Sequence, residues 1–327
     1  MALHHFVPQT YLRGFASNDD PNRVFYYDRR VGKTHKRSIE DICGQKNLYR
    51  LHMDDGGLSD ALEESFATIA EPLFRQILQK LANRQPLSRS EKSEFAAYIA
   101  LQMIRTPFAR RISDSIGRDV YDTETKKWWK RLLDDDYREK EFAKLKQDTG
   151  TELDLTKLTR DDIQGIIDGT TFTVAWNMPK ENWIKNQMEV MAEVFPALEQ
   201  MHWHIYFAPP QAAFITSDNP IGILVREGDG YMLGTGILAP NGIRLFPLSS
   251  KACLEIRDDI RTGFSFGDTT REKVRQINRV TAMSCDQILI GSNERLVNWW
   301  APHIKDFNLA DMVAAHYREK IRNNDYT

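Results

Sequence analysis

Two adjacent histidines mark the part of the sequence whose side chains are best suited to chemistry. His4 and His5 belong to a stretch, residues 4–15, that is rich in imidazole, guanidinium and aromatic groups. Chain ends are usually frayed unless tertiary contacts hold them. This terminus is therefore predicted to fold inward and to form part of a site. The other polar side chains assigned to that site are Gln9, Tyr11 and Arg13.

A second polar cluster, Ser217-Asp218-Asn219, comes directly after residues 213–215, which are expected to form a strand. Asp and Asn side chains stabilise turns by bonding to the nearby main chain, so an ordinary β-turn explains the cluster without any function. In the functional interpretation, Asp218 faces a cleft as a metal ligand or general base, with Ser217 and Asn219 beside it on the substrate. The sequence leaves both interpretations open.

A third cluster lies near the end of an otherwise apolar helix. Gln102 and Arg105 are three residues apart, so they share one face of that helix. An interior ion pair or a helix cap explains them structurally. In the functional interpretation, Gln102 contacts a substrate and Arg105 stabilises its developing negative charge.

Two functions from different classes follow from these clusters. The favoured one is a metal-dependent hydrolase, most simply a nuclease, in which His4, His5, Asp218 and Arg105 are catalytic. His5 and Asp218 would hold a divalent metal (Mg²⁺, Mn²⁺ or Zn²⁺), because imidazole and carboxylate are common ligands of such ions. The alternative is a non-catalytic binding or sensor protein for an anionic small molecule or a nucleotide, since arginine and tyrosine suit such ligands. The partner is accordingly nucleic acid or an anionic small molecule.

A purely structural role for the two histidines is the third interpretation, because buried histidines are commonly hydrogen-bonded rather than catalytic. His4 and His5 are also similar to the first half of an HNH nuclease finger that His52 would close. That finger is disfavoured, because residues 54–57 place a loop after His52 where the finger has a helix.

The elements that must position these residues can be read from the hydrophobic pattern. Helical periodicity runs over residues 62–81 and 181–201, and Ser88 with Glu91 predicts a capping box that opens another helix. Strands are predicted near both ends of the chain, including residues 24–28, 47–51, 203–207 and 287–290. We therefore expect a single α+β domain over residues 1–327. It has a mostly helical body, an antiparallel sheet assembled from N- and C-terminal strands, and a charged helical protrusion at about residues 110–160.

Composition excludes several classes of protein. A formal net charge of -2 over 327 residues excludes a basic nucleic-acid-binding domain. Cys43, Cys253 and Cys285 are widely spaced, which argues against a disulfide framework or a thiolate zinc site. No apolar run reaches the length of a membrane span or a signal peptide, so a cytoplasmic protein is expected, with no membrane partner.

The motifs together resemble a known family. Residues 4–15, the Arg105-Thr106-Pro107 step, Thr216-Ser217-Asp218-Asn219-Pro220 and Pro247-Leu248-Ser249 are similar, in order, to the bacterial domain-of-unknown-function family 4238. The resemblance implies a bacterial protein without an established reaction. It also gives phage defence as one biological context, because such families occur among phage-defence genes.

Overall fold

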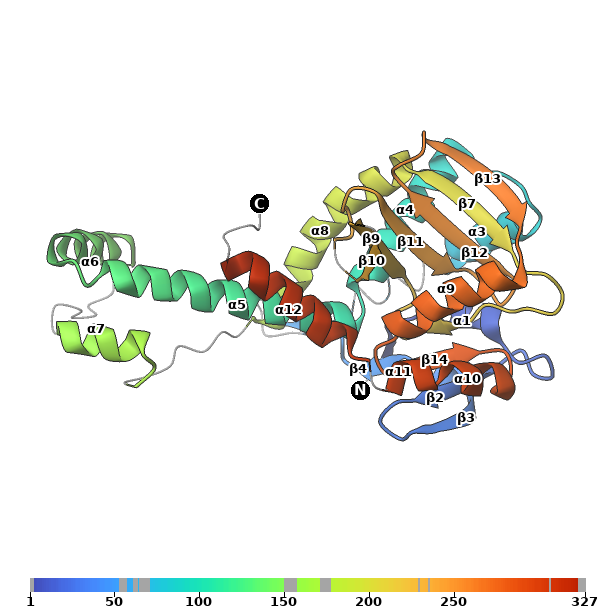
Figure 1. Cartoon of the computed structure of the whole chain (residues 1–327), viewed down its shortest axis with the longest axis horizontal. Helices are drawn as coiled ribbons and strands as arrows, with labels where there is room; N and C mark the ends of the chain where they lie inside the picture. The colour runs from blue at the N-terminus through green and yellow to red at the C-terminus, as the bar shows by residue number, and fades with distance from the viewer. Residues whose placement is uncertain are drawn as a thin grey trace. The chain divides into compact units, whose positions relative to one another are not determined.

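The computed structural model describes residues 3–52, 58–60, 64, 71–149, 158–170, 178–228, 230–234, 236–305 and 307–322. Its contacts divide the chain into two compact units. Unit 1 comprises Met1–Arg111 and Pro179–Val313, and unit 2 comprises Ile112–Met178 and Ala314–Thr327. Helices and mainly antiparallel sheets occur together, which confirms the α+β class (Figure 1). The single domain with a charged protrusion stays a prediction.

One sheet of unit 1 combines strands from both ends of the chain, as predicted. Its order is β3-β2-β14-β8, and every neighbouring pair is antiparallel. Gly32, with φ 71°, allows the tight turn that joins β2 to β3. The strands are β2 (Arg23–Asp28), β3 (Lys33–Ser38), β8 (Thr216–Ser217) and β14 (Ile288–Gly291).

A second sheet of unit 1 uses residues from the final third of the described chain. Its order is β10-β9-β11-β12-β7-β13, and the edge strand β13 runs parallel to β7. This otherwise antiparallel sheet therefore has one parallel edge strand. The strands are β7 (His202–Phe207), β9 (Gly222–Glu227), β10 (Gly230–Leu233), β11 (Gly242–Pro247), β12 (Ala252–Arg257) and β13 (Gly263–Asp268).

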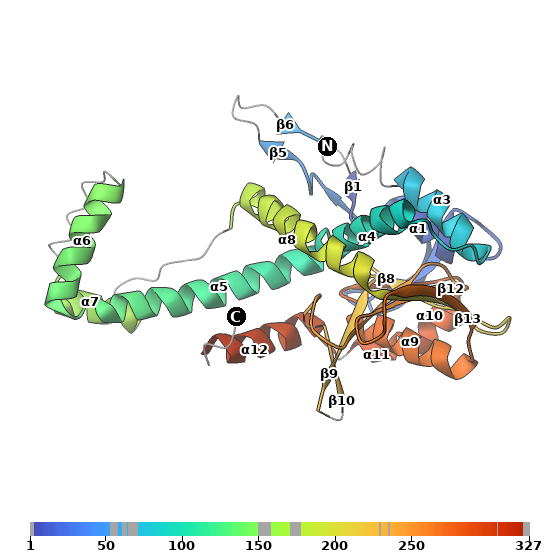
Figure 2. The same ribbon diagram turned by 90° about the horizontal axis from the view of Figure 1, so that it is seen from above.

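Two helices begin at their sequence signals, whereas the predicted start of the helix at residues 62–81 lies outside the described residues and α3 is described from Glu71. Ser88 and Glu91 form the predicted capping box at the start of α4, and Pro107 opens the next helix. Helices α4 and α8 pack against each other (Figure 2). The helices that lie in unit 1 are α1 (Gln9–Leu12), α3 (Glu71–Ala82), α4 (Arg89–Ile104), α8 (Lys180–Gln200), α9 (Arg271–Ser284), α10 (Glu294–Trp300) and α11 (Pro302–Lys305).

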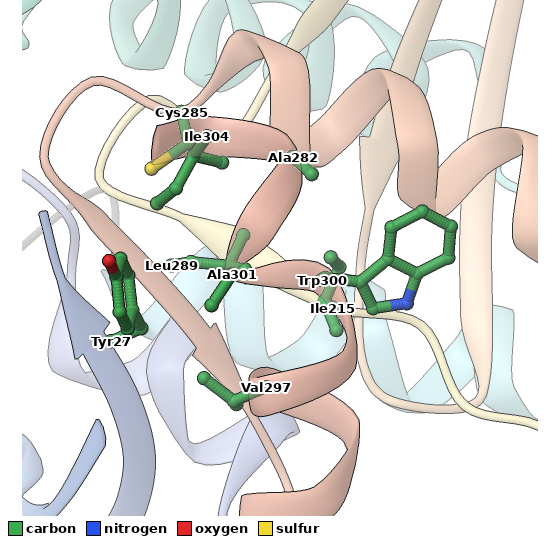
Figure 3. Close-up of a cluster of buried hydrophobic side chains, with 9 residues drawn as sticks. All are labelled: Tyr27, Ile215, Ala282, Cys285, Leu289, Val297, Trp300, Ala301 and Ile304. Carbon is green, nitrogen blue, oxygen red and sulfur yellow. The ribbon is translucent and has the colours of Figure 1, made fainter. Parts of the chain in front are cut away.

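A hydrophobic cluster joins α9, α10 and α11 to the sheet that β2 and β14 form (Figure 3). Trp300 of α10 is its largest member, with 5% of its surface exposed. This packing holds α9, α10 and α11 against β14. It therefore also positions the polar residues next to these elements. The nine residues are Tyr27, Ile215, Ala282, Cys285, Leu289, Val297, Trp300, Ala301 and Ile304.

Short strands and a turn follow the N-terminus. Strand β1 (Leu3–His5) pairs antiparallel with β4 (Gly44–Lys46), and β5 (Leu51–His52) pairs with β6 (Leu58–Ser59). The predicted strand at residues 47–51 is wrong over its first residues, which form a turn. Asn47 has φ 54°, a conformation that interrupts a strand and that asparagine tolerates.

Unit 2 has its own small apolar core, built from Trp129, Leu132, Ile163 and Ile166. Within the unit, Arg318 Nε donates to Asp119 at 2.8 Å. Its helices are α6 (Asp135–Thr149), α7 (Arg160–Ile167), most of α5 (Pro107–Arg131) and the latter part of α12 (Leu309–Arg322). Among the helices in the described part of the chain, none has the length and apolar character that a membrane crossing requires.

Candidate functional site

His4 is fully buried, and both of its ring nitrogens face polar groups. The main-chain N–H of Tyr49 donates to Nδ1 at 3.0 Å, and Nε2 lies 3.3 Å from a carboxylate oxygen of Asp60. Because Nδ1 accepts, the proton of the neutral ring sits on Nε2, the nitrogen near that carboxylate. Burial lowers the pKa of His4. The neutral ring therefore joins the N-terminal strand to the turn at residues 47–49.

The end of α4 holds the same strand through its main chain. Arg105 donates to the carbonyl of His5, and Gln102 Nε2 donates to the carbonyl of Phe6 at 2.9 Å. Tyr49 completes the connection, because its hydroxyl donates to the carbonyl of Arg105 at 2.6 Å. The structure therefore brings the first and third predicted clusters together. The His5 ring itself lies 3.1 Å from the carbonyl of Glu40.

The other site residues predicted in the N-terminal stretch are Tyr11, Gln9 and Arg13, and their surroundings differ. Tyr11 is buried, and its hydroxyl donates to the carbonyl of Pro247 at 2.7 Å and lies 2.6 Å from Thr216 Oγ1. Because a hydroxyl has one proton, Thr216 is the donor in the second bond. Gln9 is half-buried at the start of α1, and Arg13 is exposed.

Asp218 lies at the end of β8, where its carboxylate binds the chain segment that leads into β14. It accepts main-chain N–H bonds from Asp286 (3.0 Å), Gln287 (2.8 Å) and Ile288 (3.0 Å). The Cys285 thiol also lies 3.6 Å from its Oδ1. These partners lie 67 to 70 residues away in the sequence, not in the nearby main chain that the predicted β-turn requires, so Asp218 connects two strands of the four-stranded sheet.

The neighbours of Asp218 stabilise the local turn at residues 217–219. The hydroxyl of Ser217 donates to the carbonyl of Asn219 at 2.8 Å and accepts from its main-chain N–H at 3.2 Å. The side-chain amide of Asn219 donates to the carbonyl of Ser284 at 2.9 Å, at the end of α9. Both residues are buried, so this turn is rigidly held.

A cavity of about 580 Å³ opens beside Asp218, and we call it the carboxyl cavity. Asp286 also lines it and forms an ion pair with Arg111, while Arg30 donates to both carboxylate oxygens of Asp28 at 3.1 and 2.9 Å. Each ion pair fixes a guanidinium group at the cavity wall. The charged lining residues are Asp28, Arg30, Arg37, Asp41, Arg111, Asp218 and Asp286.

The electrostatics of this cavity are dominated by the two adjacent carboxyl groups. Burial, and then the negative charge of Asp286, raise the pKa of Asp218 to about 7, against the opposing effect of the three main-chain N–H bonds. The usual value for an aspartate is near 4. A carboxyl group that titrates near neutral pH in a cavity is typical of a functional site.

The side chains of His4 and His5 bond to other parts of the chain than the side chain of Asp218 does. The rings of His4 and His5 bond to the N-terminal region, and the carboxylate of Asp218 bonds to residues 285–288. The joint metal site of His5 and Asp218 therefore stays a prediction. Within the described ranges, no group of three or more His, Cys, Asp or Glu side chains is arranged to hold a metal ion.

Sequence reasoning missed Asp286 and Arg111, which the fold places beside Asp218. One signal was available for Asp286, because this acidic residue lies two positions before the buried strand β14, and Asp218 directly follows β8. Paired strands bring such positions to the same end of a sheet. For Arg111, four residues after Pro107 in a charged helix, the sequence offered no signal.

Comparison with known proteins identifies a family but no activity. The sequence model of the family described as "Protein of unknown function (DUF4238)" matches residues 3–295 and confirms the resemblance. No curated protein and no solved structure matches the chain.

Proposed function

Because the chain belongs to the DUF4238 family, whose description names no activity, we propose its function from the geometry of the carboxyl cavity. The proposal is a metal-dependent hydrolase that cleaves phosphate esters, with nucleic acid as the substrate class predicted from the sequence. A phage-defence setting, which the family resemblance implies, belongs to the same proposal.

The observation that carries this proposal is the mixture of charges around one cavity. Four aspartates and three arginines line it, so a bare anion would meet no excess of positive charge. A phosphate ester together with a divalent cation fits better. Carboxylates favour the cation, and the guanidinium groups of Arg111 and Arg30 favour the phosphate oxygens.

The carboxylates present suit such a cation. Mg²⁺ commonly binds one or two protein carboxylates and completes its coordination with water and substrate phosphate oxygens. Asp286 is the better ligand, because the oxygens of Asp218 already accept three main-chain N–H bonds. When bound, the cation would polarise the phosphoryl group and lower the pKa of a coordinated water.

The protein groups supply the other requirements of hydrolysis. The carboxyl group of Asp218 accepts the main-chain N–H groups of residues 286–288, so it positions Asp286, the proposed ligand of the cation. Arg111 is held by Asp286, so its guanidinium is oriented before substrate arrives. His5 and Arg105 lie outside this set as positioning residues of the N-terminal strand.

A second candidate function is binding without catalysis at the same cavity. The observation that favours it is that both His4 nitrogens and both Asp218 oxygens already face partners within the fold. Arg30, Arg37 and Arg111 would then bind an anionic small molecule or a nucleotide, as in a sensor protein.

Cleavage assays separate the two functions. We expect the wild-type protein to cleave single- and double-stranded DNA, RNA or a small phosphodiester when Mg²⁺, Mn²⁺ or Zn²⁺ is present. Asp286→Asn should reduce the rate at least about 100-fold, because it removes the ligand charge while keeping the side-chain shape. The measurement is the initial rate, at folding matched by circular dichroism.

The control is Asp268→Asn, because Asp268 lies exposed on β13 and pairs with Arg84. It should retain full activity. If the folded wild-type protein cleaves no substrate with any of the metals, the hydrolase proposal is wrong. Thermal-shift screening of anionic ligands would then test the second candidate.

A further inference from the structure

A second cavity in unit 1, of about 590 Å³, has a different charge pattern from the carboxyl cavity. Lys251, Arg271, Arg275 and Arg295 line it, and we call it the basic cavity. The described residues that line it include no aspartate or glutamate. Since the whole chain has a net charge of -2, this concentration of cations is a local feature that attracts anions.

The positive charges of the basic cavity are only weakly offset by their surroundings. The ammonium group of Lys251 donates to the carbonyls of Pro210 (3.1 Å) and Ala212 (2.9 Å), which fixes it without neutralising its charge. Arg275 lies 3.7 Å from Glu272 on the surface of α9, and such exposed pairs are weak. The cavity therefore keeps a net positive potential.

Helical spacing directs the relevant side chains to the same cavity. Arg271 and Arg275 are four residues apart on α9, and Arg295 and Trp299 are four residues apart on α10, so each pair shares a helix face. The two helices are fixed against each other by the cluster that contains Trp300 (Figure 3). Two arginine-bearing faces thus converge without depending on loop conformation.

Trp299 gives the cavity an aromatic wall. It is 67% exposed, whereas its neighbour Trp300 is 5% exposed and packs in the core. An indole left in water at the edge of a cationic cavity offers a flat face for a planar ring. Stacking on an aromatic side chain beside arginines is the usual way in which proteins hold an unpaired base.

We propose that the basic cavity binds a nucleotide. The base stacks on Trp299, and the phosphate accepts hydrogen bonds from Arg271, Arg275 and Arg295. The volume of the cavity lies within the range of ordinary ligand sites. The nucleotide can be free or part of a single strand, because the same contacts serve both. Binding here is independent of hydrolysis at the carboxyl cavity.

Fluorescence anisotropy of a labelled single-stranded 12-mer tests this site on the full chain, with Mg²⁺ absent so that cleavage does not interfere. We expect the protein to bind the single strand more tightly than a duplex of the same sequence, because the bases of a duplex are stacked on one another and cannot stack on Trp299. Trp299→Ala should weaken binding about tenfold. The double variant Arg271→Ala/Arg295→Ala should reduce the slope of log affinity against log salt by up to about 0.7, the single-strand value for one phosphate, because the three arginines share one phosphate.

Competition identifies the source of the nucleotide. Displacement of the 12-mer by AMP or ADP at a lower concentration than by inorganic phosphate supports a site for free nucleotides. Displacement by unlabelled single strands, but not by mononucleotides, supports a site for a strand. In both cases the base must contribute, so equal displacement by phosphate and nucleotides would overturn the stacking on Trp299.

Two exposed residues outside the cavity provide matched controls. Tyr231→Ala removes an aromatic ring that is 59% exposed on β10, and Arg89→Ala removes a guanidinium whose side chain is 97% exposed. Both should bind as the wild type does. No binding of any nucleotide or strand by the folded protein, or unchanged affinity of Trp299→Ala, would overturn the proposal.

Discussion

Replacing Asp218 with alanine is expected to lower the free energy of unfolding by about 3 to 5 kcal/mol. The two carboxyl oxygens accept the main-chain N–H groups of Asp286, Gln287 and Ile288, all within 3.0 Å. An unsatisfied buried donor costs about 1 to 3 kcal/mol, and alanine leaves three of them. The measurement is urea unfolding followed by tryptophan fluorescence at pH 5.

The matched comparison is Asp268→Ala, which removes an exposed carboxylate that pairs with Arg84. Exposed ion pairs contribute about 0 to 1 kcal/mol, so this variant should unfold close to the wild type. A loss of less than 1 kcal/mol in Asp218→Ala would mean that the carboxylate does not join β8 to β14. The role assigned to Asp218 would then be wrong.

The second large effect is a pH dependence of stability that originates at Asp218. Its pKa is raised to about 7 in the folded protein and is close to the ordinary aspartate value of 3.8 in the unfolded chain. Between these values the folded state binds more protons at Asp218, so the contribution of this group to stability is greatest below about pH 4 and is lost as the pH rises to about 7. The expected loss is about 2 to 4 kcal/mol.

This loss is measured as the difference between wild type and Asp218→Ala in urea unfolding at a series of pH values. The difference is needed because His4, whose pKa burial lowers, acts in the opposite direction and stabilises the fold as the pH rises. Asp218→Ala should be most destabilising at about pH 4 to 5 and less so at pH 8. Equal destabilisation at every pH would contradict the raised pKa of Asp218.

Local signals made much of the fold predictable from the sequence. The capping box of Ser88 and Glu91 and the strand predicted at residues 203–207 each depend on nearby residues. The strand predicted at residues 47–51 failed because a tertiary contact competes. Tyr49 gives its main-chain N–H to the buried ring of His4, and Asn47 adopts a positive φ.

The sites were less predictable, because contacts distant in sequence build them. Asp218 was recognisable from its place after a strand. Arg111 lines the same cavity as Asp218 because the fold places the first turn of α5 beside the start of β14. The basic cavity depends on two helices whose arginines look like ordinary surface charges in the sequence, and a net charge of -2 hides them. Composition excludes a basic domain but does not exclude a local basic surface.

The most direct test of the proposed hydrolase is the binding of Mn²⁺, measured by electron paramagnetic resonance from the loss of the free-ion signal. We expect about one bound ion per wild-type chain, retained in Asp268→Asn and lost in Asp286→Asn, because Asp286 is the carboxylate offered to the cation. Equal binding by wild type and Asp286→Asn, or no binding by the folded wild-type protein, would contradict a metal site at the carboxyl cavity.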